Sequence, residues 1–249
     1  MLPPAVPSRP PACARGCASN QVTSLRLYRK LEGKGFRPDH AAEVDVNRPE
    51  LSNICDYIVC GTRCTLVEPE PDSIKRIQKL CEQYKNITLY PVAAYDFNGE
   101  LELSQRHEST YVSEIKNSPA VVNDGYVPVP EDRFTARAVT FDAVDDGTID
   151  LLSIDVEGSE WFVIKHMTGR PSVISVETHG KRYTNPHLEE IRIWMADEGY
   201  ALWYKGKTDS VFVKKGSIAV SLLDRLHLLV TDLYLKIRML RKGMRYRSR

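Results

Sequence analysis

The sequence lacks several patterns that would assign it to a common class of protein. Its six cysteines form no Cys-x-x-Cys pair, which argues against a zinc site. No Gly-x-Gly-x-x-Gly motif follows the first expected strand, which disfavours a dinucleotide-binding enzyme. No apolar segment near the start is typical of a secretory signal. We therefore expect a cytoplasmic protein whose cysteines are reduced thiols that behave as small apolar side chains.

Strong net charge is also missing, because the formal sum is only +1. The charge is unevenly placed, since residues 236–249 contain seven Lys or Arg and no acid, and the remainder has 27 basic against 33 acidic residues. An acidic body with a basic tail argues against nucleic-acid binding by the fold itself. A chain of 249 residues with 42% hydrophobic residues suits one α/β domain with extensions.

The patterns divide the chain into three regions. Residues 1–22 are rich in Pro, Ala and Arg without apolar periodicity, so we expect a disordered extension. Residues 23–216 are expected to form the folded domain. Residues 217–249 predict one amphipathic helix with a basic end, which charged residues interrupt too often for a membrane span. This helix could lie peripherally on an anionic membrane, pair with a second copy of the chain, or pack on the domain.

Short apolar runs alternate with helical patterns through residues 23–216, as in a doubly wound α/β fold. The expected strands cover residues 41–46, 65–68, 87–92, 134–139, 150–155, 173–177, 201–204 and 210–213. We predict a Rossmann-like, seven-stranded, mostly parallel sheet that ends in an antiparallel hairpin. Alternation at 100–103, after Asn98-Gly99, predicts a further β-hairpin arm. Residues 104–133 are expected to be irregular and to form either a lid over the substrate or a surface insertion.

The segment from Asp150 to Trp161 is the most informative stretch of the chain. Its apolar run predicts a strand that is buried on both faces and ends in Asp155 and Glu157, after which Gly158 lets the chain turn. In open α/β sheets, ligands bind outside the carboxyl ends of the strands. The two carboxylates are therefore candidates for chemistry, with a solvated acidic turn as the alternative.

Four segments, taken in order and spacing, carry a resemblance to a known family. They are Leu66–Pro71, Asn86–Asp96 with Asn98-Gly99 after it, Ile154–Glu160 and Ile174–His179. Together they resemble the FkbM-type methyltransferase family over roughly residues 41–214. The family is similar to the class I methyltransferases, so the resemblance implies their fold and S-adenosylmethionine as the cofactor.

The loop after the first strand departs from the family pattern, because Asn47-Arg48-Pro49 contains no glycine. A methyltransferase usually has an acid here followed by glycines, which let the backbone approach the cofactor. If Glu43 is the strand-end acid, Asp45 occupies the glycine position. If Asp45 is the acid, Asn47 occupies it, which is sterically milder because Asn tolerates a left-handed backbone. We favour the first alternative, which leaves Arg48-Pro49 to open the helix, and we place Glu43 and Asp45 in the cofactor site.

Further cofactor contacts are expected at the ends of the next strands. The resemblance assigns Glu68 to the ribose hydroxyls, with a helix-capping surface acid as the alternative. Ala94 is small enough to leave room for a flat ring, and Asp96 could hold the adenine amino group; an ordinary tight turn is the alternative. Asp155 is expected at the same edge and is also assigned to the cofactor.

His179 is the first candidate for a catalytic base. It follows the strand that ends in Glu177, and its ordinary pKa near 6.5 would let it take a proton from a hydroxyl near neutral pH. A structural or exposed role is the alternative. Asp155 and Glu157 would orient the acceptor, or act as the base if His179 is remote. No metal is required, although Asp155, Glu157 and Glu177 could form an oxygen-ligand cation site.

These assignments predict an S-adenosylmethionine-dependent methyltransferase that acts on a hydroxyl oxygen of a small molecule or sugar. The sulfonium is already a strong electrophile, so the protein mainly has to align the acceptor and remove its proton. The alternative is a binding module that keeps the fold but has lost the cofactor with its loop glycines, and that residues 217–249 hold at a membrane.

Overall fold

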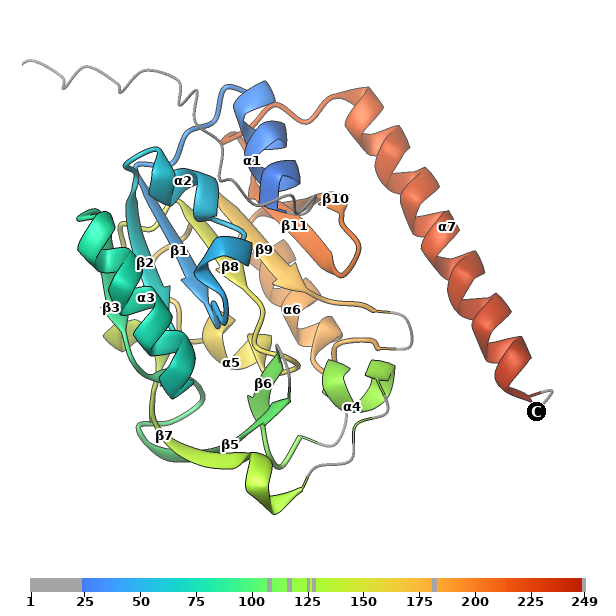
Figure 1. Cartoon of the computed structure of the whole chain (residues 1–249). Helices are drawn as coiled ribbons and strands as arrows, with labels where there is room; N and C mark the ends of the chain where they lie inside the picture. The colour runs from blue at the N-terminus through green and yellow to red at the C-terminus, as the bar shows by residue number, and fades with distance from the viewer. Residues whose placement is uncertain are drawn as a thin grey trace, which may run out of the picture.

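The computed structural model describes residues 24–106, 109–115, 118–124, 126, 129–180 and 183–247. Its main element is a seven-stranded sheet with the strand order β10-β11-β9-β8-β1-β2-β3 (Figure 1). The strands are β1 (His40–Val44), β2 (Arg63–Val67), β3 (Ile87–Tyr90), β8 (Leu151–Ile154), β9 (Val173–Glu177), β10 (Tyr200–Lys205) and β11 (Asp209–Lys214). Only β11 runs antiparallel to its neighbours, so the predicted mostly parallel sheet with a final antiparallel hairpin is confirmed. The expected extension at residues 1–22 lies outside the described residues.

The three central strands are buried along their whole length, as expected for parallel strands that are covered on both faces. Val44 at the end of β1 lies opposite both Val67 of β2 and Ile154 of β8. Ile154 in turn lies opposite Val176 of β9. This register brings the carboxyl ends of four strands to one edge of the sheet, so the residues that follow them share that edge.

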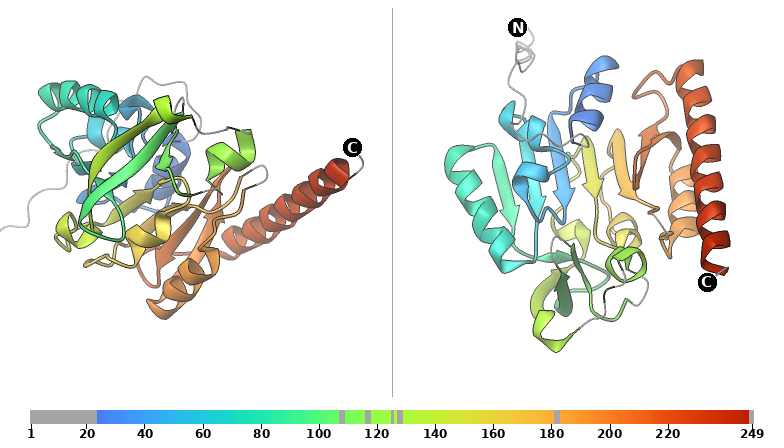
Figure 2. Two further views of the ribbon diagram at one scale, coloured as in Figure 1. Left: turned by 90° about the horizontal axis from the view of Figure 1, so that it is seen from below. Right: turned by 45° about the vertical axis from the view of Figure 1, so that its right-hand side comes forward.

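Helices cover the two faces of the sheet, as the two views of Figure 2 show. The helices are α1 (Ser24–Gly33), α2 (Cys55–Val59), α3 (Pro71–Gln83), α4 (Pro119–Asp124), α5 (Glu160–Ile164), α6 (Leu188–Asp197) and α7 (Leu222–Arg247). Short 3-10 turns are η1 (Pro49–Leu51), η2 (Pro130–Asp132) and η3 (Phe141–Ala143). One core joins Ala41 and Leu151 to helices α1, α2 and α3, and the other joins Ala42 and Leu152 to α5 and α6. Neighbouring strand residues thus enter opposite cores, which is the two-residue period of a strand.

The chain forms a second, smaller sheet beyond the carboxyl edge of the first. Its order is β4-β7-β5-β6, built from β4 (Ala93–Ala94), β7 (Arg133–Val139), β5 (Gly99–Arg106) and β6 (Ser109–Val112). The expected irregular region 104–133 is therefore partly wrong, because residues 104–106, 109–112 and 133 are in strands. Leu101, Leu103 and Val112 become buried together with Ala93 and Ala138, and this small core holds the sheet together.

The start of α3 differs from the sequence prediction. The sequence alone favours Asp72 or Ser73 as the cap of this helix. In the structure the Glu70 side chain is the cap, because it accepts hydrogen bonds from the backbone N–H groups of both residues, at 2.9 and 2.6 Å. Pro71 occupies the first helical turn, where its missing N–H costs nothing. Glu70 is 4% exposed. Its carboxylate lies at the start of the helix, where the helix dipole favours negative charge.

The expectation of six reduced thiols is wrong for one cysteine. Cys55 is disulfide-bonded, whereas Cys60, Cys64 and Cys81 are free thiols. Burial raises the pKa of the Cys81 and Cys64 thiols, which keeps both protonated and unreactive.

Helix α7 is much longer than the other helices and lies along the outside of the domain against β10 (Figure 2). It begins at Leu222 rather than at Ser217 because a capping box forms just before it. Ser221 accepts a hydrogen bond from the Asp224 N–H at 3.2 Å, and its own N–H donates to the Asp224 carboxylate at 2.8 Å. Within the described ranges, no helix is long and apolar enough to cross a membrane.

Candidate active site

Two pockets open at the carboxyl edge of the large sheet and meet at Asp45. The first, which we call the apolar pocket, has a volume of about 340 Å³. It is lined by Val44, Asp45, Val67, Pro69, Val92, Ala93, Ala94, Tyr95, Leu101, Leu103, Thr110, Tyr111, Val112, Val156 and Ser159. The second, which we call the acidic pocket, has a volume of about 640 Å³. It is lined by Glu43, Asp45, Val46, Asn47, Leu51, Ser52, Asn53, Asp155, Glu157, Thr208 and Asp209.

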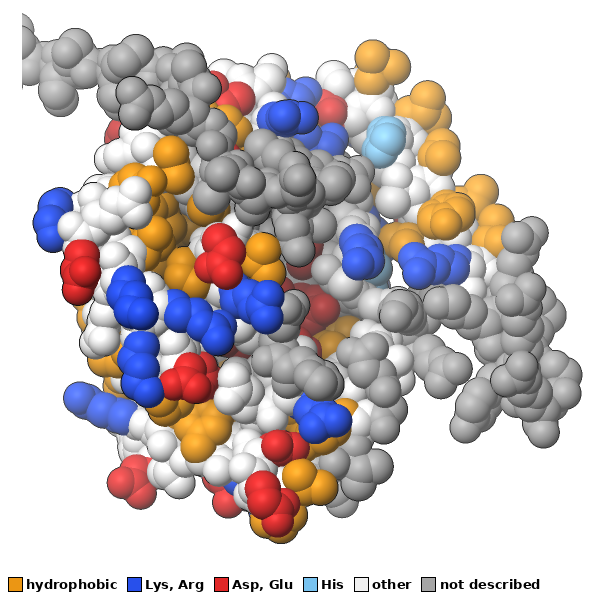
Figure 3. Space-filling model, in the orientation of Figure 1, with side chains coloured by type: hydrophobic (Ala, Val, Ile, Leu, Met, Phe, Trp, Pro, Cys, Tyr) orange, Lys and Arg blue, Asp and Glu red, His pale blue; other side chains and the backbone are white. Residues whose placement is uncertain are grey.

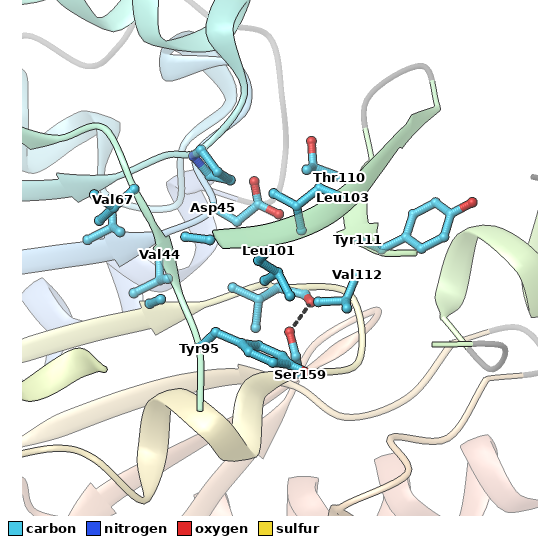
Figure 4. Close-up of a pocket in the computed structure, with 15 residues that line it drawn as sticks. Val44, Asp45, Val67, Tyr95, Leu101, Leu103, Thr110, Tyr111, Val112 and Ser159 are labelled. Carbon is cyan, nitrogen blue, oxygen red and sulfur yellow. Dashed lines mark hydrogen bonds between the residues drawn. The ribbon is translucent and has the colours of Figure 1, made fainter. Parts of the chain in front are cut away.

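The apolar pocket lies between the two sheets. Figure 4 shows Leu101 and Leu103 of β5 across the pocket from Val44, with the Asp45 carboxylate directed toward the β5 side. Leu101 and Leu103 lie on the same face of β5 because side chains alternate along a strand, and Thr110, Tyr111 and Val112 of β6 complete this side of the pocket. The second sheet therefore serves as one wall of the pocket, which the sequence prediction of an irregular lid did not foresee.

The loop after β1 has the backbone shape of a glycine-rich loop without containing glycine. Asp45 and Asn47 both adopt left-handed conformations, with φ of 65° and 52°. Both alternatives for the glycine position therefore have the backbone that glycine would favour. The loop is held by hydrogen bonds from the Asp45 N–H to the Val67 carbonyl at 2.9 Å and from the Asn47 N–H to the Glu68 carboxylate at 2.7 Å. Strained backbone of this kind is typical of ligand sites.

Glu43 lies within β1 and its carboxylate holds the segment that leads into α2. It accepts hydrogen bonds from the Ser52 hydroxyl and from the Asn53 N–H, the latter at 2.9 Å. Burial raises the pKa of Glu43 to about 7, and the two hydrogen bonds oppose that rise. Glu43 borders the acidic pocket, as predicted for a residue of this edge, but much of its bonding capacity is already used by the protein.

Glu68 is fully buried and does not belong to the described lining of either pocket. One carboxylate oxygen accepts the Asn47 N–H and the other accepts the Glu70 N–H at 2.8 Å. Burial raises the pKa of Glu68 to about 7. The acid that the resemblance assigned to the ribose thus ties the loop after β1 to the loop after β2.

Asp45 is the acid that faces both pockets. Its Oδ1 atom is buried and has no hydrogen-bond partner among the described residues. Burial, followed by the nearby charges of Glu68 and Asp155, raises the pKa of Asp45 well above its ordinary value. A buried acceptor without a donor is costly, so this atom is suited to bind a hydroxyl or ammonium group of a ligand.

Ala94 and Asp96 are separated by the structure. Ala94 lines the apolar pocket together with Ala93, as expected for small residues beside a flat ring. Asp96 is outside the described pocket lining and forms ion pairs with Lys165 and His166, with its Oδ1 at 3.1 Å from the His166 Nε2. Lys165, as the first cause, lowers the pKa of Asp96.

Three carboxylates at the ends of β8 and β9 form a compact cluster. Asp155, Glu160 and Glu177 each place one carboxylate oxygen within 4.8 Å of the others. This spacing could hold a metal ion, and the trio contains Glu160 in place of the expected Glu157. Glu160 already accepts hydrogen bonds from the Gly158 N–H at 3.1 Å and from the Asn185 side-chain amide. Burial raises the pKa of Glu160 to about 8 and also raises that of Glu177.

Asp155 and Glu157 both line the acidic pocket, as predicted. Burial, and then the charge of Glu157, raises the pKa of Asp155 to about 7. Asp155 and Glu177 each place one carboxylate oxygen within 4.8 Å of the other. Glu157 has a left-handed backbone with φ of 52°, the third such residue at this edge. A carboxyl group that titrates near pH 7 is suited to exchange protons with a ligand.

His179 lies apart from this cluster. Its Nδ1 atom is 2.9 Å from the Thr178 hydroxyl, and it is not among the described residues that line the two pockets. Burial and the positive charge of Lys205 lower the pKa of His179 to about 4. The ring is therefore neutral near pH 7 and a weak base.

The sequence prediction missed two polar residues of the site. Asp209 lines the acidic pocket and lies directly opposite Glu177 in the pairing of β11 with β9, and burial raises its pKa to about 7. The Tyr183 hydroxyl is buried without a hydrogen-bond partner among the described residues. The charges of Glu160 and Glu177, after burial, raise the pKa of Tyr183. The predicted pairing of the last hairpin could have pointed to Asp209; no local pattern pointed to Tyr183.

Positive charge is missing from both pockets. No Lys or Arg occurs among the described lining residues, whereas five carboxylates line the acidic pocket. Arg48, the basic residue of the loop after β1, is outside that lining. The site therefore favours ligands that carry positive charge or hydrogen-bond donors.

Comparison with known proteins identifies the family of the chain. The model of the methyltransferase FkbM domain matches residues 43–202. Among solved structures, an FkbM methyltransferase from Methylobacillus flagellatus KT is 13% identical, with a TM-score of 0.46 over 71% of this chain and 44% of that chain. MtNAS in complex with S-adenosylmethionine is 15% identical, with a TM-score of 0.38 over 77% of this chain and 62% of that one. A SAM-dependent methyltransferase from Aquifex aeolicus is 9% identical, with a TM-score of 0.39 over 81% and 94%. Comparison with curated proteins gave no significant match.

Proposed function

We propose that this chain, which belongs to the FkbM methyltransferase family, transfers the methyl group of S-adenosylmethionine to a hydroxyl oxygen of a small molecule or sugar. The observation that carries the proposal is the position of Asp45 between an apolar and an acidic pocket at the carboxyl edge of the sheet. S-adenosylmethionine has a flat adenine base at one end, an amino acid group at the other and a cationic sulfonium between them, so its base matches the apolar pocket and its sulfonium matches the acidic pocket.

The residues present fit three parts of the cofactor, which are the adenine ring, a ribose hydroxyl or the amino group, and the sulfonium. The apolar pocket offers Ala93, Ala94 and Leu101 to the adenine ring. The unpartnered Oδ1 atom of Asp45 can accept a hydrogen bond from a ribose hydroxyl or from the amino group. The acids of the neighbouring pocket, Asp155 among them, favour a sulfonium centre by charge.

The carboxylate of the cofactor has to bind beside acids without the help of a lining Lys or Arg. Asn47 and Asn53 supply the neutral side-chain amides of that wall, whereas the Ser52 hydroxyl already donates to Glu43. Neutral donors stabilise a carboxylate less than a guanidinium does, so this end of the cofactor contributes least to affinity. We expect binding in the micromolar range for this reason.

The reaction balances as a displacement at the methyl carbon. When bound, S-adenosylmethionine supplies a methyl group on a positive sulfur, and the new O–C bond forms as the C–S bond breaks. The acceptor's hydroxyl proton passes to the Asp155 carboxylate, which lines the acidic pocket and titrates near pH 7. Glu157 would orient the acceptor from the same turn. We assign the base to Asp155 because His179 is outside the pocket lining and is a weak base.

Calorimetric titration with S-adenosylmethionine and its demethylated product tests the cofactor site. We expect micromolar binding by the unmodified protein and about tenfold weaker binding by Asp45→Asn, which keeps a residue tolerant of the left-handed backbone but removes the charge. Asp197→Asn, at an exposed position of α6, is the control and should bind as the unmodified protein does.

A second candidate is a binding module that keeps the fold without the cofactor, favoured by the glycine-free loop and the wall of acids. In that case Asp45 repels the cofactor's carboxylate, so Asp45→Asn and Asp45→Gly would bind more tightly than the unmodified protein. No binding by any of the three proteins would remove the methyltransferase activity from consideration.

A further inference from the structure

Helix α7 presents a continuous apolar stripe to solvent. The stripe consists of Leu222, Leu223, Leu226, Leu229, Val230, Leu233, Tyr234 and Ile237, which are between 40% and 81% exposed. In Figure 3 apolar side chains follow the outer edge of the molecule along α7. Eight large apolar residues on one helix are more than the scattered exposed residues of an ordinary surface, so the stripe calls for a partner.

The opposite face of α7 is already used, because it holds the helix on the domain. Asp224 forms an ion pair with Lys34 of the α1 end at 2.5 Å, and Asp232 forms one with Lys205 of β10. Leu228 lies on this inner side and is half-buried. The stripe is therefore the outward face of a docked helix, with its position fixed relative to the domain.

The stripe is wide and has basic borders. At about 100° per residue, its eight positions fall within an arc of about 140°, which is wider than a coiled-coil seam. Arg225 and Lys236 follow one border of the arc, and His227 and Arg238 follow the other. Asp224 pairs with Lys34, and Asp232 pairs with both Lys205 of β10 and Lys236 of α7. The charges that border the stripe are therefore mostly positive.

We propose that α7 docks lengthwise on the surface of an anionic lipid bilayer. The stripe enters the boundary between headgroups and acyl chains, while the flanking Lys and Arg side chains reach the lipid phosphates and carboxylates. Residues 236–249 add seven basic residues and no acid, which an anionic surface attracts. The helix lies on the bilayer rather than across it, since none of the described helices is apolar enough to span one.

Charge favours the bilayer over a second copy of the chain. Pairing two α7 helices side by side in parallel would bring two basic ends together, each with seven positive charges in residues 236–249. Like charges in contact oppose association, whereas an anionic surface offers opposite charge along the whole helix. Leu222 and Leu229 also widen the stripe at positions where a coiled coil usually carries charge.

Sedimentation with lipid vesicles tests this proposal and does not depend on the methyltransferase activity. The full chain is mixed with vesicles of phosphatidylcholine and phosphatidylserine, and in parallel with vesicles of phosphatidylcholine alone. We expect binding to the anionic vesicles that weakens as salt is added. The double variant Leu226→Asp with Leu233→Asp should lower the partition coefficient by about 100-fold or more, because two apolar anchors become charged. Ile193→Asp, an exposed apolar position on α6, is the matched control and should bind normally.

A second variant separates the contribution of charge to vesicle binding from that of the apolar stripe. Arg225→Gln with Arg238→Gln should weaken binding to anionic vesicles by about fivefold per charge and leave the stripe intact. Since the substituted residues of both variants have no role in the core, an unchanged melting temperature checks that the fold is retained.

Three results would overturn the proposal. The unmodified protein could fail to bind anionic vesicles, or it could bind both vesicle types equally. Alternatively, sedimentation velocity could reveal a dimer that Leu226→Asp with Leu233→Asp abolishes, which would assign the stripe to a second copy of the chain.

Discussion

Seven carboxyl groups at the carboxyl edge of the sheet have raised pKa values, and burial is the first cause in every case. They are Glu43, Asp45, Glu68, Asp155, Glu160, Glu177 and Asp209. Each is easier to protonate in the folded protein than in the unfolded chain. The free energy of unfolding therefore depends on pH through these groups.

At the residue scale, we predict that stability falls as pH rises toward neutrality. A raised folded-state pKa contributes stability that is complete below the unfolded value of 4.5 for Glu43 and is lost as pH rises through about 7. For Glu43 alone the difference is about 3 kcal/mol. Urea unfolding between these pH values should give a falling midpoint, and Glu43→Gln should make the fall smaller. A midpoint that rises over this range would contradict the assignment.

Catalysis gives a second prediction at the residue scale. Asp155→Asn should lower kcat by about 100-fold or more, because the proton acceptor is lost, and should flatten the pH profile of kcat near 7. His179→Ala should leave kcat close to that of the unmodified protein. The opposite pattern, with activity lost in His179→Ala and kept in Asp155→Asn, would return the base to His179.

At the scale of elements, much of the large sheet could be predicted because its signals are local. The apolar runs at Leu151–Ile154 and Val173–Glu177 are strands of the expected length, and the acids after them face the expected edge. The second sheet could not be predicted as such, since Leu103 of β5 also pairs with Phe134 of β7, far along the chain, and this contact has no local signature. A single sequence carries little information about which distant segments pair with each other.

The directions of particular side chains also could not be predicted from the sequence. His179 and Glu177 are only two residues apart, yet Glu177 belongs to the cluster of acids, whereas His179 contacts the Thr178 hydroxyl and is outside the described lining of both pockets. The cap of α3 is a similar case, because three acids or hydroxyls in sequence could each have capped it and only the fold selects Glu70.

That cap gives the prediction at this scale. Glu70→Ala should cost about 1 to 2 kcal/mol of stability, because two N–H groups at the start of α3 lose their acceptor. Glu70→Gln, which keeps one acceptor oxygen, should cost less. Denaturant unfolding measures both, with Glu50→Ala in exposed η1 as the control. An unchanged midpoint in Glu70→Ala would mean that water satisfies the two donors.

At the scale of the whole molecule, charge is separated in space. The acids gather at the carboxyl edge of the sheet, and the basic residues extend along α7, whose C-terminal end points in the same direction as β1 (Figure 1). The near-zero sum of +1 therefore conceals two regions of opposite sign. A cationic ligand and an anionic surface can each find a complementary part of the protein without competing for it.

Binding of a cationic ligand in the acidic pocket should also release protons from the protein. A cation placed among carboxyl groups that titrate near pH 7 lowers their pKa values, so protons leave for the buffer as it binds. Titration heats measured in two buffers of different ionisation enthalpy should then differ at the same pH, and equal heats would contradict this linkage. The pH of the solution would therefore determine the affinity of the site for a cationic ligand, and the affinity would decline as pH falls through about 7.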